Sequence, residues 1–165
     1  MLLIVNPTGD LEGANEEGTR IRELFKDNRG FLLTEVREAE ATRSRLLEHF
    51  RSGQFDVVHY AGHAFFDPTA PERSGLICAP PDDRNPVVLS GADVAGLGQL
   101  PMLVFFNACE SARIRGVKKI GANPKHPDRV RGLVSVAEAF MRGGVANFLG
   151  TYWPCLLYTS DAADE

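Results

Sequence analysis

A cysteine and a histidine each stand at the end of an apolar run of the length that forms a buried strand. Cys109 comes two residues after the run 103–107, and His63 closes the run 55–63. A thiol of ordinary acidity is mostly protonated at neutral pH, so it needs a neighbouring imidazole or a positive dipole to become a good nucleophile. If the two strands end side by side, the pair can carry out nucleophilic cysteine chemistry. Packing of a small apolar thiol in the core is the alternative interpretation of Cys109.

The elements around these two residues predict the sheet that would position them. Strands are predicted at 2–5, 32–36, 55–63, 103–107 and 145–152, and helices at 14–26, 41–51 and 133–141. Such alternation predicts an α/β fold with a mostly parallel central sheet and helices on both faces. Ligands of these sheets bind at the carboxyl ends of strands, where His63 and Cys109 stand. We expect Gly62 to adopt backbone angles that other residues avoid, in a turn that presents His63 over the end of the sheet.

Helical spacing and capping residues predict how the first two helices sit on this sheet. In the first helix, the expected inward residues are Ile21, Leu24 and Phe25, and Glu17 belongs to the solvent face. Thr42 is the expected N-cap of the second helix. The inward face of that helix is formed by three apolar residues: Leu46, Leu47 and Phe50.

The stretch between His63 and Cys109 predicts a small β insertion. Within residues 65–101, short strands are expected at 74–79 and 86–89, and Cys78 is a packing residue of the first of them. Ser90 then caps a short helix that returns the chain to the sheet.

The composition limits the class of protein that the chain can be. Its 165 residues, of which 44% are hydrophobic, suffice for one core and one domain. No apolar run approaches the length of a membrane span and no signal peptide opens the chain, so a cytoplasmic protein without a membrane partner is expected. Three distant cysteines without a CxxC pair indicate neither disulfides nor a zinc site. A net charge of −4 gives no sign of direct nucleic-acid binding.

Two segments differ in character from the rest of the chain. Residues 113–131 hold seven of the 18 Lys and Arg residues, with only Asp128 opposing them. This predicts a solvated basic loop, which could steer acidic partners if it overhangs the Cys109 end of the sheet. Residues 155–165 resemble translated sequencing-adapter read-through, and we interpret them as a non-native, artefactual tail. We therefore expect one domain over residues 1–154 that is incomplete at its C-terminus.

Two pentapeptides give the chain a family resemblance. Residues 59–63 (HYAGH) and 107–111 (NACES) resemble the two signatures of CHAT domains. These are caspase-like clan CD cysteine peptidase domains, related to caspases and separases and often found beside tetratricopeptide repeats. The 46 positions between His63 and Cys109 (109 − 63) are also close to the spacing in caspase-type peptidases, about 50 residues. Further matches follow in the same order as in the family: Asn6-Pro7, Gly9-Asp10-Leu11, Ser74-Gly75-Leu76 and Gly150-Thr151-Tyr152-Trp153-Pro154.

The resemblance implies a three-layer caspase-like fold with a catalytic dyad. It assigns the catalytic histidine to His63 and the nucleophile to Cys109 of a cysteine endopeptidase that works through a thioester acyl-enzyme and needs no cofactor or metal. His59 becomes a structural residue. The implied oxyanion donors are the backbone N–H groups of Cys109 and of Gly62 or Ala64. The implied substrate-binding residues are Asp10, Leu11, Glu110 and Trp153.

The implied partners are a protein or peptide substrate and a tetratricopeptide-repeat region of the full-length protein. A non-catalytic CHAT-like interaction domain is the alternative function, although a pure binding module has no chemical need for both His63 and Cys109. Residues 13–20 superficially resemble a phosphate-binding loop, but Glu16 and Glu17 would face the phosphates and no lysine precedes a Ser or Thr. The sequence therefore favours a peptidase over a nucleotide hydrolase.

Overall fold

The computed structural model describes residues 1–67, 70–80, 87–108, 115–116, 133–134 and 136–151. Cys109, Glu110 and Trp153 lie outside the described residues. The same is true of the 155–165 segment and of nearly all of the basic segment 113–131, so the expectations for both segments stay predictions.

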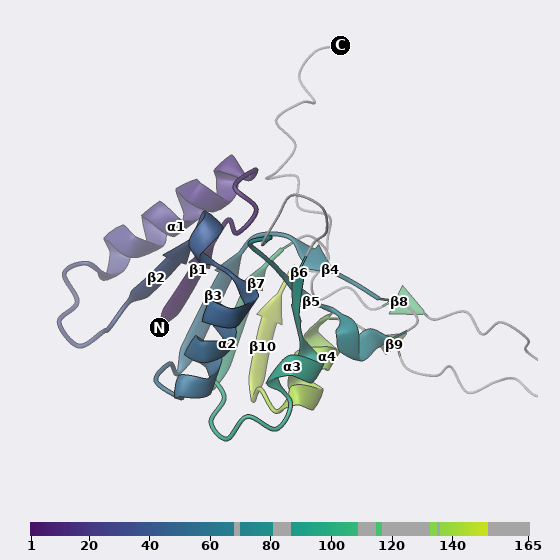
Figure 1. Cartoon of the computed structure of the whole chain (residues 1–165). Coiled ribbons are helices and arrows are strands. Elements are labelled where there is room, and N and C mark those ends of the chain that lie inside the picture. Colours follow the sequence, from purple (N-terminus) through teal and green to yellow (C-terminus); the bar gives the residue numbers. More distant parts are fainter. Residues whose placement is uncertain (68–69, 81–86, 109–114, 117–132, 135, 152–165) are drawn as a thin grey trace, which may run out of the picture.

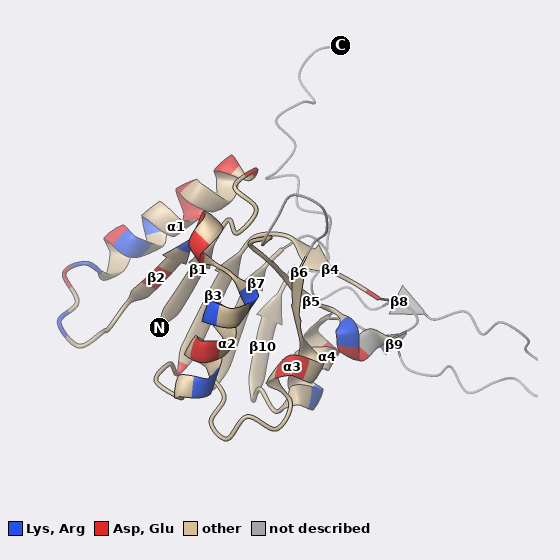
Figure 2. Ribbon diagram, viewed as in Figure 1, with Lys and Arg blue, Asp and Glu red and all other residues tan. Residues whose placement is uncertain are grey.

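Five parallel strands form the central sheet, as the sequence predicted. Their order across the sheet is β10-β7-β3-β1-β2. The strands are β1 (Leu2–Val5), β2 (Thr34–Arg37), β3 (Val57–Ala61), β7 (Leu103–Asn107) and β10 (Asn147–Gly150). Four of them carry no charged side chain, which fits strands covered on both faces. Figure 2 shows these four strands in tan, with the charged residues on helices, on loops and on β2.

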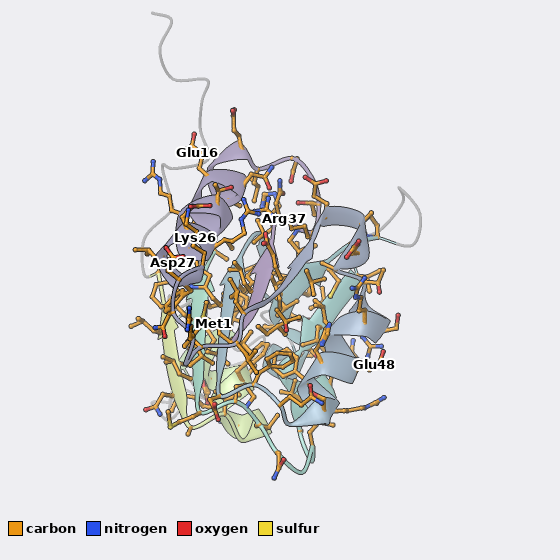
Figure 3. The ribbon with its side chains drawn as sticks, turned by 90° about the vertical axis from the view of Figure 1, so that its left-hand side faces the viewer. Met1, Glu16, Lys26, Asp27, Arg37 and Glu48 are labelled. Atoms are coloured by element: carbon orange, nitrogen blue, oxygen red, sulfur yellow. The ribbon has the colours of Figure 1, made fainter. Side chains whose placement is uncertain are left out.

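Helices cover both faces of this sheet. Helix α1 (Glu12–Phe25) lies on one face, against β1 and β3. Helices α2 (Arg43–Ser52) and α4 (Val136–Gly143) and the short helix α3 (Gly91–Val94) share the other side of the molecule. Figure 1 shows this arrangement. In Figure 3, α1, which carries Glu16, and α2, which carries Glu48, lie on opposite sides of the strands. Two short 3-10 helices complete the set: η1 (Glu38–Glu40) and η2 (Pro71–Arg73).

Aromatic rings from neighbouring strands fill the core beneath α2 and α4. Because side chains alternate along a strand, Tyr60 of β3, Phe106 of β7 and Phe148 of β10 point to the same face. The rings of Tyr60 and Phe106 stack with their centroids 4.7 Å apart, and Phe106 also meets Phe148 at 5.6 Å and Phe140 of α4 at 6.0 Å. Each such ring pair is worth about 1 kcal/mol beyond its buried area. The first pair joins β3 to β7, and the other two join β7 to β10 and to α4.

Small residues bring α1 close to the opposite face. Ala14 and Gly18 are its buried residues, and a Cβ on Gly18 would lie 2.6 Å from Cγ2 of Val5. The prediction that Leu24 points inward is wrong, because this side chain is 76% exposed. The inward stripe follows positions 14, 18, 21 and 25, and Leu24 falls to its side.

The β insertion forms a small antiparallel sheet in the order β4-β5-β6. Its strands are β4 (Ala64–Phe65), β5 (Gly75–Cys78) and β6 (Val87–Ser90). Cys78 is fully buried, and burial raises the pKa of its thiol to about 12. Its predicted packing role is confirmed.

The predicted helix at 133–141 begins later than expected. Leu133–Val134 form strand β9, which pairs antiparallel with β8 (Arg115–Gly116), and the helix starts at Val136. The predicted helix placed Leu133 and Val134 in its first turn, but β8 supplies hydrogen-bond partners to their backbone instead. Gly144, with φ +111°, follows the last helical residue and ends the helix as predicted.

Candidate active site

Strands β3 and β7 are neighbours, and they end level with each other. They pair in parallel, with Ala61 opposite Asn107 at the last described step. His63 is two residues beyond Ala61, and Cys109 is two residues beyond Asn107. The adjacency that the sequence required of these two strands is therefore present. The structure describes β7 and its extension as far as Ala108, one residue before Cys109.

The backbone around His63 is held on several sides. The N–H of Gly62 donates to the carbonyl of Asn107 at 3.2 Å, which extends the ladder between β3 and β7 by one bond. The carbonyl of His63 accepts from the N–H of Ile77 at 3.0 Å and from the Tyr60 hydroxyl at 2.6 Å. The imidazole itself keeps 36% of its side-chain surface exposed. His63 thus has a fixed backbone and an accessible ring.

Position 62 requires glycine because a side chain would not fit there, and not because of its backbone angle. It is not among the glycines with positive φ, so the expected unusual backbone angle is absent. A Cβ at this position would lie 2.5 Å from the Tyr60 hydroxyl oxygen and 3.0 Å from Cδ of Pro7. The missing side chain lets the Tyr60 hydroxyl reach the carbonyl of His63.

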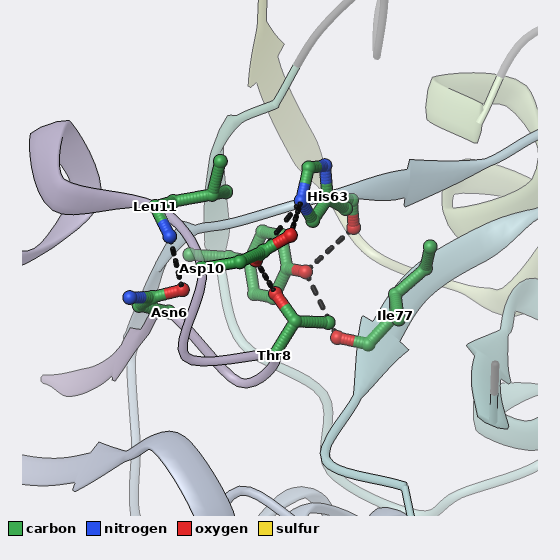
Figure 4. A network of polar contacts seen from close by, with 7 residues as sticks. Asn6, Thr8, Asp10, Leu11, His63 and Ile77 are labelled. Carbon is green, nitrogen blue, oxygen red and sulfur yellow. Dashed lines mark hydrogen bonds and ion pairs between the residues drawn. The ribbon is translucent and has the colours of Figure 1, made fainter. Parts of the chain in front are cut away.

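The Asp10 carboxylate contacts the His63 ring. Its Oδ2 and Oδ1 atoms lie 3.1 and 3.2 Å from Nε2, and the Thr8 hydroxyl donates to Oδ1 (Figure 4). Partial burial acts to raise the pKa of Asp10, but the hydrogen bonds from Thr8 and His63 outweigh it and hold that pKa below its ordinary value. The acid is therefore ionised at neutral pH and faces the imidazole.

A tight turn after β1 brings Asp10 to this place. Asn6 has φ 45° and Gly9 has φ 76°, and the Gly9 N–H donates to the Asn6 carbonyl at 3.0 Å. The Asn6 side chain accepts from the N–H of Leu11 at 3.1 Å. Leu11 is only 6% exposed and packs in a cluster with Ala14 and Ala61. The side chain of Leu11 therefore packs beneath the turn and holds it in place, and little of its surface is exposed for contact with a substrate.

A second polar group ties α1 to both strands below the site. Glu17 accepts from Nε2 of His59 at 2.7 Å and from the side-chain amide of Asn107. The His59 ring stacks on Phe105, with centroids 4.6 Å apart and an angle of 8° between the planes. These contacts agree with the structural role implied for His59. Glu17 was predicted to lie on the solvent face. The sequence feature that could have placed it near the sheet is Gly18, because a glycine in the middle of a helix marks close approach to a neighbouring element.

The end of β7 is also held from the other side. The hydroxyl of Thr151, just after β10, donates to the carbonyl of Ala108. The backbone position immediately before Cys109 is thus fixed by its neighbour strand.

The backbone N–H of Ala64, in β4, does not bond to the neighbouring strand β5. Because Ile77 bonds to His63, the next pair along, Ala64 and Leu76, is a non-hydrogen-bonded pair of the antiparallel ladder. The Ala64 N–H therefore points away from β5.

The described residues form an α/β protein in which His63 follows the end of one strand, and in the sequence Cys109 follows the neighbouring strand. The family model described as CHAT domain matches residues 3–157. The chain belongs to the CHAT domain family, which includes caspase-like peptidases. None of the curated proteins compared with the chain matches it.

No group of three or more His, Cys, Asp or Glu residues among those that the structure describes could hold a metal ion. None of the helices in the described part of the chain has the length and apolar character needed to span a membrane.

Proposed function

We propose that this protein is a cysteine endopeptidase in which Cys109 is the nucleophile and His63 is the general acid and base. The observation that carries the proposal is the pairing of β3 with β7. Both residues stand two positions beyond the last paired residues, Ala61 and Asn107, of adjacent parallel strands. Consecutive Cα atoms are about 3.8 Å apart, so neither residue can lie far from the end of its strand.

In the first step the Cys109 thiolate attacks the scissile carbonyl carbon. A carbon–sulfur bond forms and the carbonyl oxygen becomes an oxyanion. When the tetrahedral intermediate collapses, the carbon–nitrogen bond breaks and the imidazolium of His63 gives its proton to the leaving amine. The product is a thioester between Cys109 and the acyl half of the substrate.

In the second step water attacks the thioester carbonyl. Neutral His63 accepts a proton from this water, the carbon–sulfur bond breaks, and the acid product leaves. The thiolate and imidazolium are then restored.

Backbone N–H groups are the proposed stabilisers of the oxyanion. Of the two donors considered beside His63, the N–H of Gly62 is bonded to Asn107, whereas that of Ala64 points away from β5. We therefore assign the role to Ala64 together with Cys109. Each such donor contributes about 2.7–4 kcal/mol of transition-state stabilisation in peptidases where it has been removed.

The substrate-binding assignments have unequal support. Glu110 and Trp153 lie outside the described residues and stay predictions. The burial of Leu11 limits its side chain to supporting the turn. Asp10 is at the site, but its carboxylate contacts His63.

A peptide library tests the function. The whole chain is incubated with a peptide mixture, alongside the Cys109→Ala and His63→Ala variants, and new termini are identified by mass spectrometry. We expect cleavage by the wild type, none by Cys109→Ala, and a rate lower on the order of 10²-fold for His63→Ala. His49→Ala, on α2, is the matched histidine control and should cleave like the wild type. Identical products from the wild type and Cys109→Ala would favour the non-catalytic interaction domain.

A further inference from the structure

The carboxylate of Asp10 meets one particular nitrogen of the His63 ring. Both of its oxygens lie within 3.2 Å of Nε2. Within the described part of the chain, Nδ1 has no such partner, and Figure 4 shows Asp10 on the Nε2 side of the ring. A carboxylate only accepts hydrogen bonds, so the neutral ring carries its proton on Nε2 and its lone pair on Nδ1.

We propose that Asp10 is a positioning residue for His63: it holds Nε2–H and so leaves Nδ1 to exchange a proton with the Cys109 thiol. This rests on the proposed function of the His63 and Cys109 pair. It also gives Asp10 a different role from the binding of a basic substrate side chain. A base oriented by a third group is the general arrangement of activated nucleophiles.

Asp10 is itself held in place, as a positioning residue must be. The Thr8 hydroxyl donates to Oδ1, and the turn that carries both residues is closed by the bond from Gly9 to Asn6. The depressed pKa of Asp10 agrees with a carboxylate that stays ionised while it faces the ring.

The charge of Asp10 favours the same proton transfer to His63 as its position does. Proton transfer from the thiol to His63 creates an imidazolium, which an adjacent carboxylate stabilises. The side chains of Asp10 and His63 are 61% and 36% exposed, so solvent screens this attraction. The expected effect of removing the charge is therefore a few-fold change in rate.

The test compares the iodoacetamide alkylation rate of Cys109 in the whole chain, followed on its tryptic peptide. The variants are wild type, Asp10→Asn, His63→Ala and Glu12→Gln. Glu12 is exposed in the first turn of α1, so its substitution removes the same charge nearby without touching the ring. We expect Asp10→Asn to slow alkylation about two- to fivefold, His63→Ala to slow it about tenfold or more, and Glu12→Gln to leave it unchanged.

A second readout separates positioning from general damage to the fold. The ¹⁵N shifts of the His63 ring report which nitrogen carries the proton. We expect the Nε2–H tautomer in the wild type and a mixture of tautomers in Asp10→Asn, at an unchanged midpoint of urea unfolding.

The outcomes distinguish the two proposals. If His63→Ala slows alkylation but Asp10→Asn reacts like the wild type and keeps the Nε2–H tautomer, the role of Asp10 is overturned and the dyad survives. The same holds if Asp10→Asn only raises KM for peptides with a basic residue before the scissile bond. If His63→Ala alkylates at the wild-type rate, the dyad itself fails.

Discussion

Replacing Gly62 with alanine tests how the backbone of His63 is held. The added Cβ would lie 2.5 Å from the Tyr60 hydroxyl oxygen and 2.7 Å from Cζ of the same ring. Tyr60 is fully buried and stacked on Phe106, so the ring cannot move away freely. Overpacking of this kind costs about 1–3 kcal/mol. For a domain of this size a loss of 2 kcal/mol lowers Tm by roughly 4–8 °C.

A double-mutant cycle with Tyr60→Phe locates the cause. Removing the hydroxyl costs about 0.5–1.5 kcal/mol, because the backbone carbonyls of His63 and Ile77 lose the hydrogen bonds that it donates. It also removes the nearest clashing atom, so Gly62→Ala should cost about 1 kcal/mol less in the Tyr60→Phe background than in the wild type. The ring carbon at 2.7 Å remains, and the relief is therefore partial.

Urea unfolding of the four proteins, followed by circular dichroism, measures the cycle. A shift in the midpoint at constant m reports a change in stability alone. Strict additivity of the two substitutions, or a neutral Gly62→Ala, would refute the reasoning, since either result means that the alanine does not meet the hydroxyl.

Three other features of the structure give measurable predictions. Gly18→Ala should destabilise the fold by about 1–3 kcal/mol in urea because α1 approaches β1 closely, while the exposed Gly30→Ala should change stability by less than about 0.5 kcal/mol. Burial acts to raise the pKa of Asp93, but the hydrogen bonds of its helix cap and of Arg43 outweigh it and lower that pKa. The contribution of ionised Asp93 to the free energy of unfolding should thus be complete above about pH 4 and be lost as the pH falls through the lowered pKa. In acid titrations, Asp93→Asn should therefore make the free energy of unfolding depend less steeply on pH. Cys78, whose pKa is raised to about 12 by burial, should be alkylated only when urea unfolds the chain; labelling of its peptide in native buffer at pH 8 would contradict the packing.

The central sheet could be predicted because its strands are short apolar runs that alternate with helices. Such runs stay out of water only when both faces are covered, which fixes a parallel sheet between helices. Local capping chemistry was equally informative: the Thr42 side chain accepts from the N–H of Arg45 at 3.3 Å, as its type and position predict. The inward face of α1 was harder, because two small residues, Ala14 and Gly18, bring it near the sheet and carry little apolar signal.

The site could be predicted only in part. The positions of His63 and Cys109 after their strands follow from the sequence. The contact from Asp10 to His63 joins residues 53 positions apart and depends on the positive φ of Asn6 and Gly9. Pattern and propensity do not specify such a turn, because an asparagine or glycine permits a positive φ without requiring it. The link from Glu17 to His59 and Asn107 likewise depends on how deeply α1 settles on the sheet.

The central claim is that His63 activates Cys109 for attack on a carbonyl carbon. A peptidyl acyloxymethyl ketone, which reacts with activated thiolates, tests it most directly when the adduct is mapped by mass spectrometry. We expect a single adduct on Cys109, formed on the order of tenfold or more slowly in His63→Ala than in the His49→Ala control. Equal rates in the two variants, or equal labelling of the other cysteines, would contradict the account.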